Sequence, residues 1–182
     1  MDLNQDKSAE LKLYTCGPTV YNFAHIGNLR SYVFADVVYR TQKFSGHQIK
    51  WIMNITDIDD KTIRNTVEES GAKSGIEELK KYTDRYYQDF LKDLDKLNIS
   101  RSAIKFIKVS DVVPQIQDFI VKLIKKGYAY QADDGNTYFS IEKYQQDFGH
   151  YGELVGEKFL EGKKTGARVK VDEYSKDDLS DF

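Results

Sequence analysis

The sequence predicts an α/β fold in which a parallel sheet is followed by a mostly helical stretch and a small β hairpin. Three observations predict it: a strand–helix–strand pattern near the start, long amphipathic helical patterns after it, and a hairpin signal at Asp133-Asp134-Gly135. The chain has 182 residues, enough for one domain with a core and a small appendage. Hydrophobic residues make up 40% and aromatic residues 13%, so most of the chain should be ordered.

The first three elements form one unit of the predicted sheet. Residues 11–16 alternate between apolar and polar side chains and end at Gly17-Pro18, which is typical of a strand that runs into a turn. Residues 28–44 carry apolar side chains at close to helical spacing. Residues 48–55 have an apolar end suited to a buried parallel strand. A strand, a helix and a second strand in this order should be joined by a right-handed crossover.

The later elements are mostly helical. Residues 57–70 begin with an acidic run, which favours a helix N-terminus. Residues 75–97 and 110–126 have apolar side chains every three or four positions, which indicates two amphipathic helices. Residues 128–131 and 136–141 flank the turn of a hairpin, and Val169-Lys170-Val171 predicts one more strand.

This order predicts two parts. Residues 1–70 would be the N-terminal half of an α/β domain, and residues 71–182 a helical stretch and an insertion with the β hairpin that is incomplete at its C-terminal end. A doubly wound sheet needs more parallel strands than these patterns supply.

Composition limits the partners and the compartment. The net charge of −2 gives no general attraction to nucleic acid, and we expect no DNA partner. An RNA contact would need a local basic face. Two lysine clusters are candidates, one formed by Lys122, Lys125 and Lys126 and the other by Lys158, Lys163 and Lys164. Either cluster could instead be ordinary solvated surface. A single cysteine excludes an internal disulfide. No signal-like or membrane-spanning apolar run is present, so we expect a cytoplasmic protein without a membrane partner.

A candidate ligand site lies where the first predicted strand gives way to the following helix. Ligands of open α/β sheets bind beyond the carboxyl ends of the strands. Cys16 lies there, and His25-Ile26-Gly27-Asn28 lies at the head of the helix, where free N–H groups attract phosphate. His25 can donate to a phosphate or ribose oxygen, Gly27 leaves room for a purine, and Asn28 can cap the helix or bind the nucleotide. A purely structural role, with His25 packed on the sheet and Asn28 as a plain cap, stays open.

Two sequence blocks carry a family resemblance. CGPTVYNFAHIGNLRSYVFADVV and the later NITDIDDK resemble class I aminoacyl-tRNA synthetases and, within them, the cysteinyl-tRNA synthetases, in which the HIGH signature commonly reads HIGN. GYAYQADDGNTYFSI and GARVKVD are also similar to segments of that family, so the resemblance covers residues 11–182. It implies the first half of a Rossmann-like sheet of the HUP type. It also implies ATP-dependent activation of cysteine and its transfer to cysteine tRNA, with ATP entering as a Mg²⁺ complex.

The resemblance implies specific roles at the nucleotide end. ATP would be bound by Pro18, Tyr21, His25, Gly27 and Asn28. His25 and Asn28 would also be catalytic, because they would stabilise the charge that develops on the leaving phosphates.

It also implies roles at the cysteine end. Cysteine would be bound by Cys16, Gly17 and Thr56, with Cys16 as the first ligand of a zinc ion that keeps an open position for the substrate thiol. Without the resemblance, we would expect Cys16 to be a small buried apolar residue. Three nearby carboxylates could bind the substrate ammonium or cap a helix: Asp57, Asp59 and Asp60. We expect Asp59 and Asp60 to be helix caps. Trp51 is expected in the core.

Several family features are missing from this sequence. One thiolate does not make a zinc site, and the chain has no second cysteine. Two histidines are poor candidates for further zinc ligands. His47 precedes a strand at the end of the sheet opposite Cys16, and His150 lies beyond the hairpin. The KMSKS motif is absent; Tyr174-Ser175-Lys176 is the nearest text. We therefore expect an incomplete, inactive fragment whose remaining zinc ligands lie outside this chain.

Three other functions stay open. One is a non-catalytic truncated paralogue that acts as a binding module. Another is the cysteine ligase of low-molecular-weight thiol biosynthesis. A nucleotidylyltransferase also uses an HxGH-type signature, but Cys16 and NITDIDDK argue against it.

Overall fold

A computed structural model describes residues 10–71, 75–149 and 151. The chain divides into two compact units, Met1–Val113 and Pro114–Phe182. Within the described residues, no helix has the length and apolar character needed to cross a membrane.

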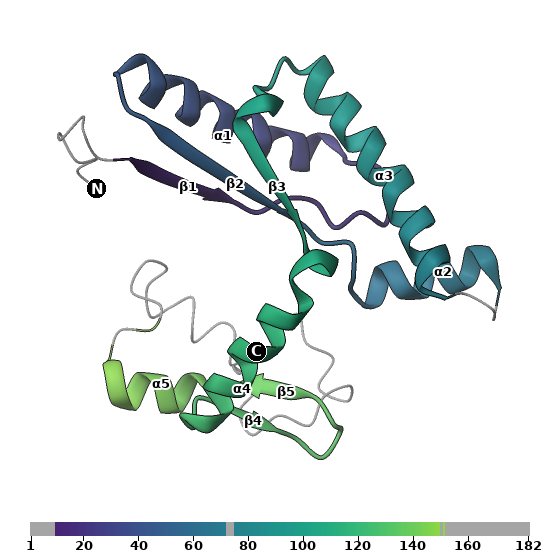
Figure 1. Cartoon of the computed structure of the whole chain (residues 1–182), viewed down its shortest axis with the longest axis vertical. Helices are drawn as coiled ribbons and strands as arrows, with labels where there is room; N and C mark the ends of the chain where they lie inside the picture. Colours follow the sequence, from purple (N-terminus) through teal and green to yellow (C-terminus); the bar gives the residue numbers. More distant parts are fainter. Residues whose placement is uncertain (1–9, 72–74, 150, 152–182) are drawn as a thin grey trace. The chain divides into compact units, whose positions relative to one another are not determined.

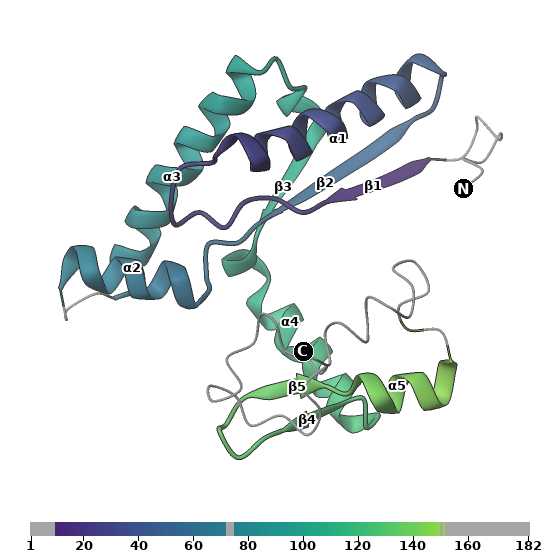
Figure 2. The same cartoon turned by 180° about the vertical axis from the view of Figure 1, so that it is seen from behind.

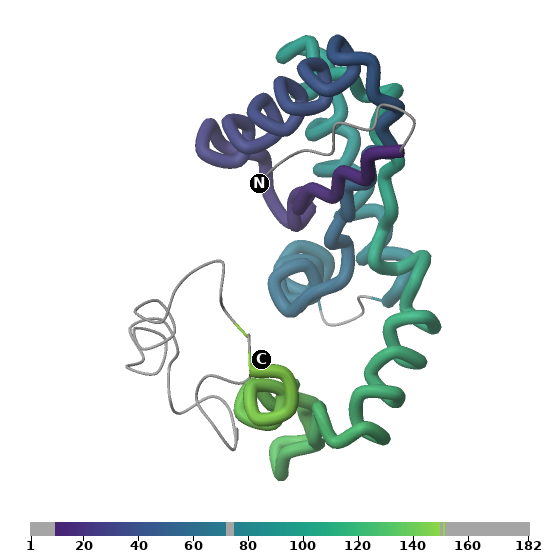
Figure 3. Tube along the Cα trace, turned by 90° about the vertical axis from the view of Figure 1, so that its left-hand side faces the viewer, coloured from purple at the N-terminus to yellow at the C-terminus, as the bar shows by residue number. Residues whose placement is uncertain are grey.

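The first unit is built on a three-stranded parallel sheet in the order β1-β2-β3 (Figure 1). The strands are β1 (Leu11–Thr15), β2 (Ile49–Ile55) and β3 (Ile104–Lys108). Helix α1 (Ile26–Phe44) connects β1 to β2, and helices α2 (Asp60–Ser70) and α3 (Ile76–Lys96) lie between β2 and β3. Figure 2 shows α1 and α3 on the same face of the sheet, and the order of the elements can be followed along the trace in Figure 3. The predicted parallel α/β fold is confirmed.

The third strand was not predicted from the sequence. Residues 98–109 were assigned to no element, yet IKFIK forms β3 and pairs with β2 from Trp51↔Ile104 to Ile55↔Lys108. Its first residues do alternate between apolar and lysine side chains, which is the signal for a half-buried strand. That signal is short, and two long amphipathic helical patterns surround it.

The core lies between β2 and the two helices. From Trp51 onward, every second residue of β2 is fully buried on this face: Trp51, Met53 and Ile55. They pack in one cluster with α1 residues Tyr32, Ala35 and Tyr39 and α3 residues Phe90 and Leu94. Burial of such side chains stabilises the fold by about 1.5–3 kcal/mol each. Trp51 is a core residue as expected, and its indole N–H donates to Thr15 Oγ1 at 2.9 Å.

A buried carboxylate on α1 fixes the approach to β3. Asp36 is 6% exposed, and its Oδ1 accepts a hydrogen bond from the Ser100 amide at 2.9 Å. Its Oδ2 pairs with Arg40, which also donates to the carbonyl of Asn98. Asn98 has a positive φ of 54°, so this ion pair supports an unusual backbone turn before β3.

The second unit contains the predicted hairpin. Strands β4 (Ala129–Gln131) and β5 (Thr137–Phe139) pair in antiparallel orientation. In the sequence they follow α4 (Val113–Lys125) and precede α5 (Ile141–Phe148). The turn between the strands has Gly135 at φ 82°, a conformation that favours glycine. The predicted strand at 169–171 and the lysines at 158, 163 and 164 lie outside the described residues. Lys122, Lys125 and Lys126 are exposed, and an RNA contact there stays a prediction.

Candidate functional site

A polar pocket of about 310 Å³ lies beyond the carboxyl end of β1, beside the start of α1. It is lined by Gly17, Pro18, Thr19, Tyr21, Asn22, Phe23, Ala24, His25, Asn28, Tyr32 and Lys61. The structure therefore brings five of the sequence-predicted residues to one pocket: Gly17, Pro18, Tyr21, His25 and Asn28. The other three, Cys16, Gly27 and Thr56, are not among its lining residues but adjoin residues that are.

The loop between β1 and α1 is fixed to the end of β2 by backbone hydrogen bonds. The Thr56 amide donates to the Pro18 carbonyl at 3.0 Å, and the Val20 amide donates to the Thr56 carbonyl at 3.1 Å. Val20 is 1% exposed and anchors the loop in the core. Thr56 thus continues the parallel ladder past the end of β2, which holds the pocket against the sheet.

Asn54 organises the first turn of this loop. Its Oδ1 accepts hydrogen bonds from the Gly17 amide at 3.0 Å and from the Tyr14 hydroxyl at 2.9 Å, and its Nδ2 donates to Thr56 Oγ1 at 3.1 Å. A Cβ on Gly17 would overlap the Asn54 backbone carbonyl and lie 2.8 Å from Met53 Cγ. Glycine is therefore required at position 17. Sequence reasoning assigned Asn54 no role, although an amide inside an apolar strand is the signal for such a contact.

His25 and Asn28 form a reciprocal cap at the N-terminus of α1. His25 Nδ1 accepts a hydrogen bond from the Gly27 amide at 3.1 Å, and Asn28 Oδ1 accepts one from the His25 amide at 3.3 Å. Because Nδ1 is an acceptor, the imidazole carries its proton on Nε2, which is free to donate. The Asn28 amide donates to the His25 carbonyl, so three of the four N–H groups at the helix start, those of His25, Gly27 and Asn28, have partners within the chain.

The outer part of the loop is held by aromatic residues of α3. The Tyr82 hydroxyl donates to the Tyr21 carbonyl at 2.7 Å, and the Phe23 ring meets the Tyr86 ring edge-on at 5.2 Å between centroids. Tyr82 is 7% exposed, and burial raises the pKa of its phenol. Its hydroxyl therefore stays a donor through the physiological range, and the pocket wall is fixed from two elements.

Tyr32 and Lys61 are among the lining residues for which the sequence predicts no role. Tyr32 is 4% exposed, and its ring packs edge-on against Phe90 at 5.1 Å. Burial, with a smaller contribution from the nearby Cys16, raises the pKa of the Tyr32 phenol to about 12. Lys61 lies at the start of α2 with its ammonium 5.3 Å from the centre of the Tyr21 ring.

The acidic run after β2 is used by the fold. Asp59 caps α2, with its Oδ1 accepting from the amides of Lys61 and Thr62 at 2.9 Å each, as expected. The expectation that Asp60 also caps α2 is wrong, because Asp60 is the first residue of the helix, where the helix dipole favours an acidic side chain. Asp57 is 6% exposed and accepts from the Ser110 amide at 3.0 Å and the Ser110 hydroxyl at 2.6 Å. This carboxylate joins the ends of β2 and β3, so it is engaged within the fold rather than free for a substrate ammonium.

The donors around Cys16 do not form a metal site in the part of the chain that the structure describes. Cys16 is exposed directly after β1. In the described ranges, no three His, Cys, Asp or Glu side chains come together in a group that could bind a metal ion. His47 precedes β2 with its buried Nδ1 unpaired, and His150 is outside the described residues. A zinc role for Cys16 stays a prediction, and it requires ligands from elsewhere.

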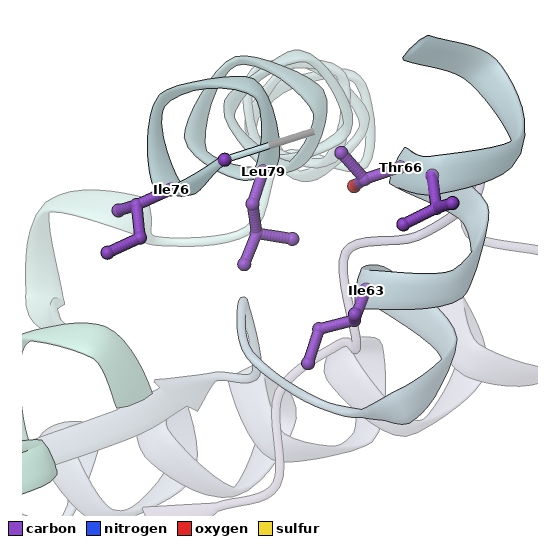
Figure 4. Close-up of a pocket in the computed structure, with 6 residues that line it drawn as sticks. Ile63, Thr66, Ile76 and Leu79 are labelled. Carbon is purple, nitrogen blue, oxygen red and sulfur yellow. The ribbon is translucent and has the colours of Figure 1, made fainter. Parts of the chain in front are cut away.

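A second cavity, of about 260 Å³, lies between α2 and α3 (Figure 4). Its side chains are almost all aliphatic, including Ile63, Ile76 and Leu79. The one lining hydroxyl, that of Thr66, donates to the Thr62 carbonyl at 2.7 Å. This cavity offers no charged group, which favours the polar pocket as the candidate site.

A parallel sheet with helices α1 and α3 on one face and a polar pocket beyond the end of β1 is consistent with part of a Rossmann-like domain. The family model for the class I (C) tRNA synthetase catalytic domain matches residues 2–182, and the chain belongs to this family.

Curated relatives share this similarity over nearly the whole chain. A cysteine–tRNA ligase from Chlamydia caviae is 45% identical over 172 residues, which is 94% of this chain and 34% of the relative. Similar proteins of the same name come from Methanosarcina mazei, at 43% identity over 97% of this chain, and Chlamydia felis, at 42% over 100%. The chain spans about a third of the length of these relatives.

Proposed function

We propose that this chain is the N-terminal part of a cysteine–tRNA ligase and carries one side of the site that activates cysteine with ATP. The observation that supports it most is the pocket between β1 and α1, which brings together Gly17, Pro18, Tyr21, His25 and Asn28. These are residues of the two sequence blocks that resemble the family, and the chain is similar to curated cysteine–tRNA ligases.

The proposed reaction has two steps. A carboxylate oxygen of cysteine attacks the α-phosphorus of ATP, the bond to the bridging oxygen breaks, and pyrophosphate leaves with the electron pair. The cysteinyl group then passes from the adenylate to the terminal ribose hydroxyl of cysteine tRNA, and AMP leaves. Mg²⁺ enters with ATP in this proposal. The protein accelerates such a reaction mainly by positioning the reactants and by stabilising charge.

The geometry suggests how the nucleotide residues act. His25 Nε2–H is the available donor to a phosphate oxygen, because Nδ1 already holds the Gly27 amide. The Asn28 carboxamide oxygen is engaged with the His25 amide, so its NH₂ group is the part that can reach the ligand. Gly27 keeps the helix start free of a side chain. Pro18 and Tyr21 supply the walls of the pocket.

The cysteine substrate would lie closer to the sheet. Cys16, Gly17 and Thr56 are the proposed contacts, and all three lie at the ends of β1 and β2. We retain Cys16 as a proposed zinc ligand, with further ligands from other parts of the enzyme. A zinc ion would bind the substrate thiol more tightly than a serine hydroxyl.

We also propose that the 182-residue chain is not competent alone and works in the cytoplasm as part of the longer enzyme. It spans about a third of its relatives, and among the described residues the outer strands β1 and β3 each pair only with β2, which leaves both edges of the sheet open. The rest of the pocket and the tRNA contacts would come from the remaining two thirds.

A chimera tests this function. Residues of the Methanosarcina mazei ligase that align with this chain are replaced by it, and ATP–pyrophosphate exchange is measured with cysteine and with serine. We expect exchange with cysteine only, and none from the 182-residue chain alone. His25→Ala should lower the exchange rate by about 10²-fold, while His47→Ala, at the opposite end of β2, serves as the matched control. A folded chimera without exchange would contradict the proposal and favour the binding-module alternative.

A further inference from the structure

The pocket has one fully charged side chain among its lining residues. Of the groups that line it, Lys61 alone carries a formal charge, since His25 uses Nδ1 as an acceptor. The start of α1 contributes less positive potential than an uncapped helix would, because the amides of His25, Gly27 and Asn28 already have partners. A ligand with anionic oxygens would therefore meet its strongest attraction at Lys61.

Lys61 stands where local helix energetics disfavours a cation. It is the second residue of α2, and a positive side chain there opposes the helix dipole. None of the ion pairs among the described residues includes Lys61, although Asp59 and Asp60 are its neighbours in sequence. A charged residue that opposes the helix dipole without an ion-pair partner is expected mainly at functional sites.

The ammonium is directed toward the pocket by Tyr21. Its Nζ lies 5.3 Å from the Tyr21 ring centre, within range of a cation–π contact. Tyr21 is itself fixed by the hydrogen bond from the Tyr82 hydroxyl to its carbonyl. A cation–π contact leaves N–H donors of the ammonium available to a ligand, so Lys61 is held in place and still able to bind.

We propose that Lys61 is a further substrate-binding residue, whose ammonium binds an anionic oxygen of the substrate. This inference rests on the proposed function, in which two substrates supply such oxygens, the phosphates of ATP and the carboxylate of cysteine. Lys61 takes no part in making or breaking a bond. Its ammonium pairs with a negative charge of the substrate that the capped start of α1 compensates only weakly.

The test follows the lysine signal directly in the 182-residue chain. Lysines are labelled as ¹³C-dimethylamines, which keep their charge, and the Lys61 signal is assigned by its loss in Lys61→Arg. ATP, pyrophosphate and cysteine are then titrated separately to about 10 mM, which detects millimolar binding. We expect ATP or pyrophosphate to shift the Lys61 signal; a shift with cysteine alone would identify the carboxylate as the partner.

Variants give the second readout, the dissociation constant for ATP from backbone amide shifts. Lys61→Gln should weaken binding about tenfold, and Lys61→Arg should restore most of it. Arg64→Gln makes the same charge change on the same helix outside the pocket lining and should have no effect. One result would overturn the inference about Lys61 and leave the proposed function standing. In it, ATP shifts the amide signals of residues 25–28, the Lys61 signal does not move, and Lys61→Gln binds ATP with wild-type affinity. No response from any signal would overturn the nucleotide role of the pocket as well.

Discussion

Gly17→Ala is the substitution that most directly tests how the loop is held to the sheet. The new methyl group would overlap the backbone carbonyl of Asn54 and lie 2.8 Å from Met53 Cγ. Met53 is fully buried, and a backbone carbonyl in a central strand cannot rotate away. The loop must therefore move, and the hydrogen bond from the Gly17 amide to Asn54 Oδ1 is lost with it.

The size of the effect follows from these two losses. Overpacking of a core site costs about 1–3 kcal/mol, and the lost hydrogen bond about 1 kcal/mol. We expect the free energy of unfolding to fall by about 3 kcal/mol, which lowers the urea midpoint by about 1.5 M if the m-value is about 2 kcal/mol/M.

Urea unfolding followed by tryptophan fluorescence measures this change. The single tryptophan, Trp51, is 1% exposed in β2 and reports on the first unit. Gly75→Ala is the matched control, because its methyl group would meet only the flexible Glu78 side chain, at 3.2 Å, and we expect a loss below about 1 kcal/mol. A loss below about 0.5 kcal/mol for Gly17→Ala would refute the argument that close backbone approach requires this glycine.

Three further predictions concern the supports of the site. Asn54→Ala leaves the Gly17 amide without its acceptor and should destabilise the first unit by about 1–3 kcal/mol in the same urea assay; an unchanged midpoint would contradict the role given to this amide. Asp57→Ala removes the acceptor of two hydrogen bonds from Ser110 and should cost about 2–3 kcal/mol, whereas Asp57→Asn, which keeps one acceptor, should cost less; equal losses would contradict it. The hydrogen bond from Arg85 lowers the pKa of Glu69 below its ordinary value of 4.5, so the stability it contributes is present above that value and is lost as the pH falls through the folded-state pKa. Acid titration of unfolding should therefore be shallower below pH 4.5 in Glu69→Gln than in the wild type; identical profiles would contradict this.

The sequence predicts the fold where periodicity is strong. The apolar end of β2 and the helical spacing of α1 indicated a strand–helix–strand unit, and Asp133-Asp134-Gly135 indicated the hairpin. Strand β3 could not be predicted in this way, because it has only five residues, IKFIK, and the longer helical patterns on both sides dominate the local sequence. Its place beside β2 depends on long-range pairing, which a local pattern does not encode.

The site shows the same division. The position of His25 and Asn28 at the start of α1 could be predicted, since it depends on neighbours in sequence. Their mutual capping depends on side-chain rotamers, which spacing does not specify. The approach of Lys61 to Tyr21, across forty residues, is set by the register of β1 with β2. Tertiary contacts of this kind are where sequence reasoning missed functional candidates.

The most direct test of the central claim is to map where ATP binds on the ¹⁵N-labelled 182-residue chain. If the pocket beside α1 is the nucleotide site, amide shifts should concentrate at Gly17, Tyr21, His25, Gly27 and Asn28, with weak, roughly millimolar affinity. Shifts centred on the cavity between α2 and α3, or shifts that persist unchanged in His25→Ala, would show that the candidate site has been placed in the wrong part of the molecule.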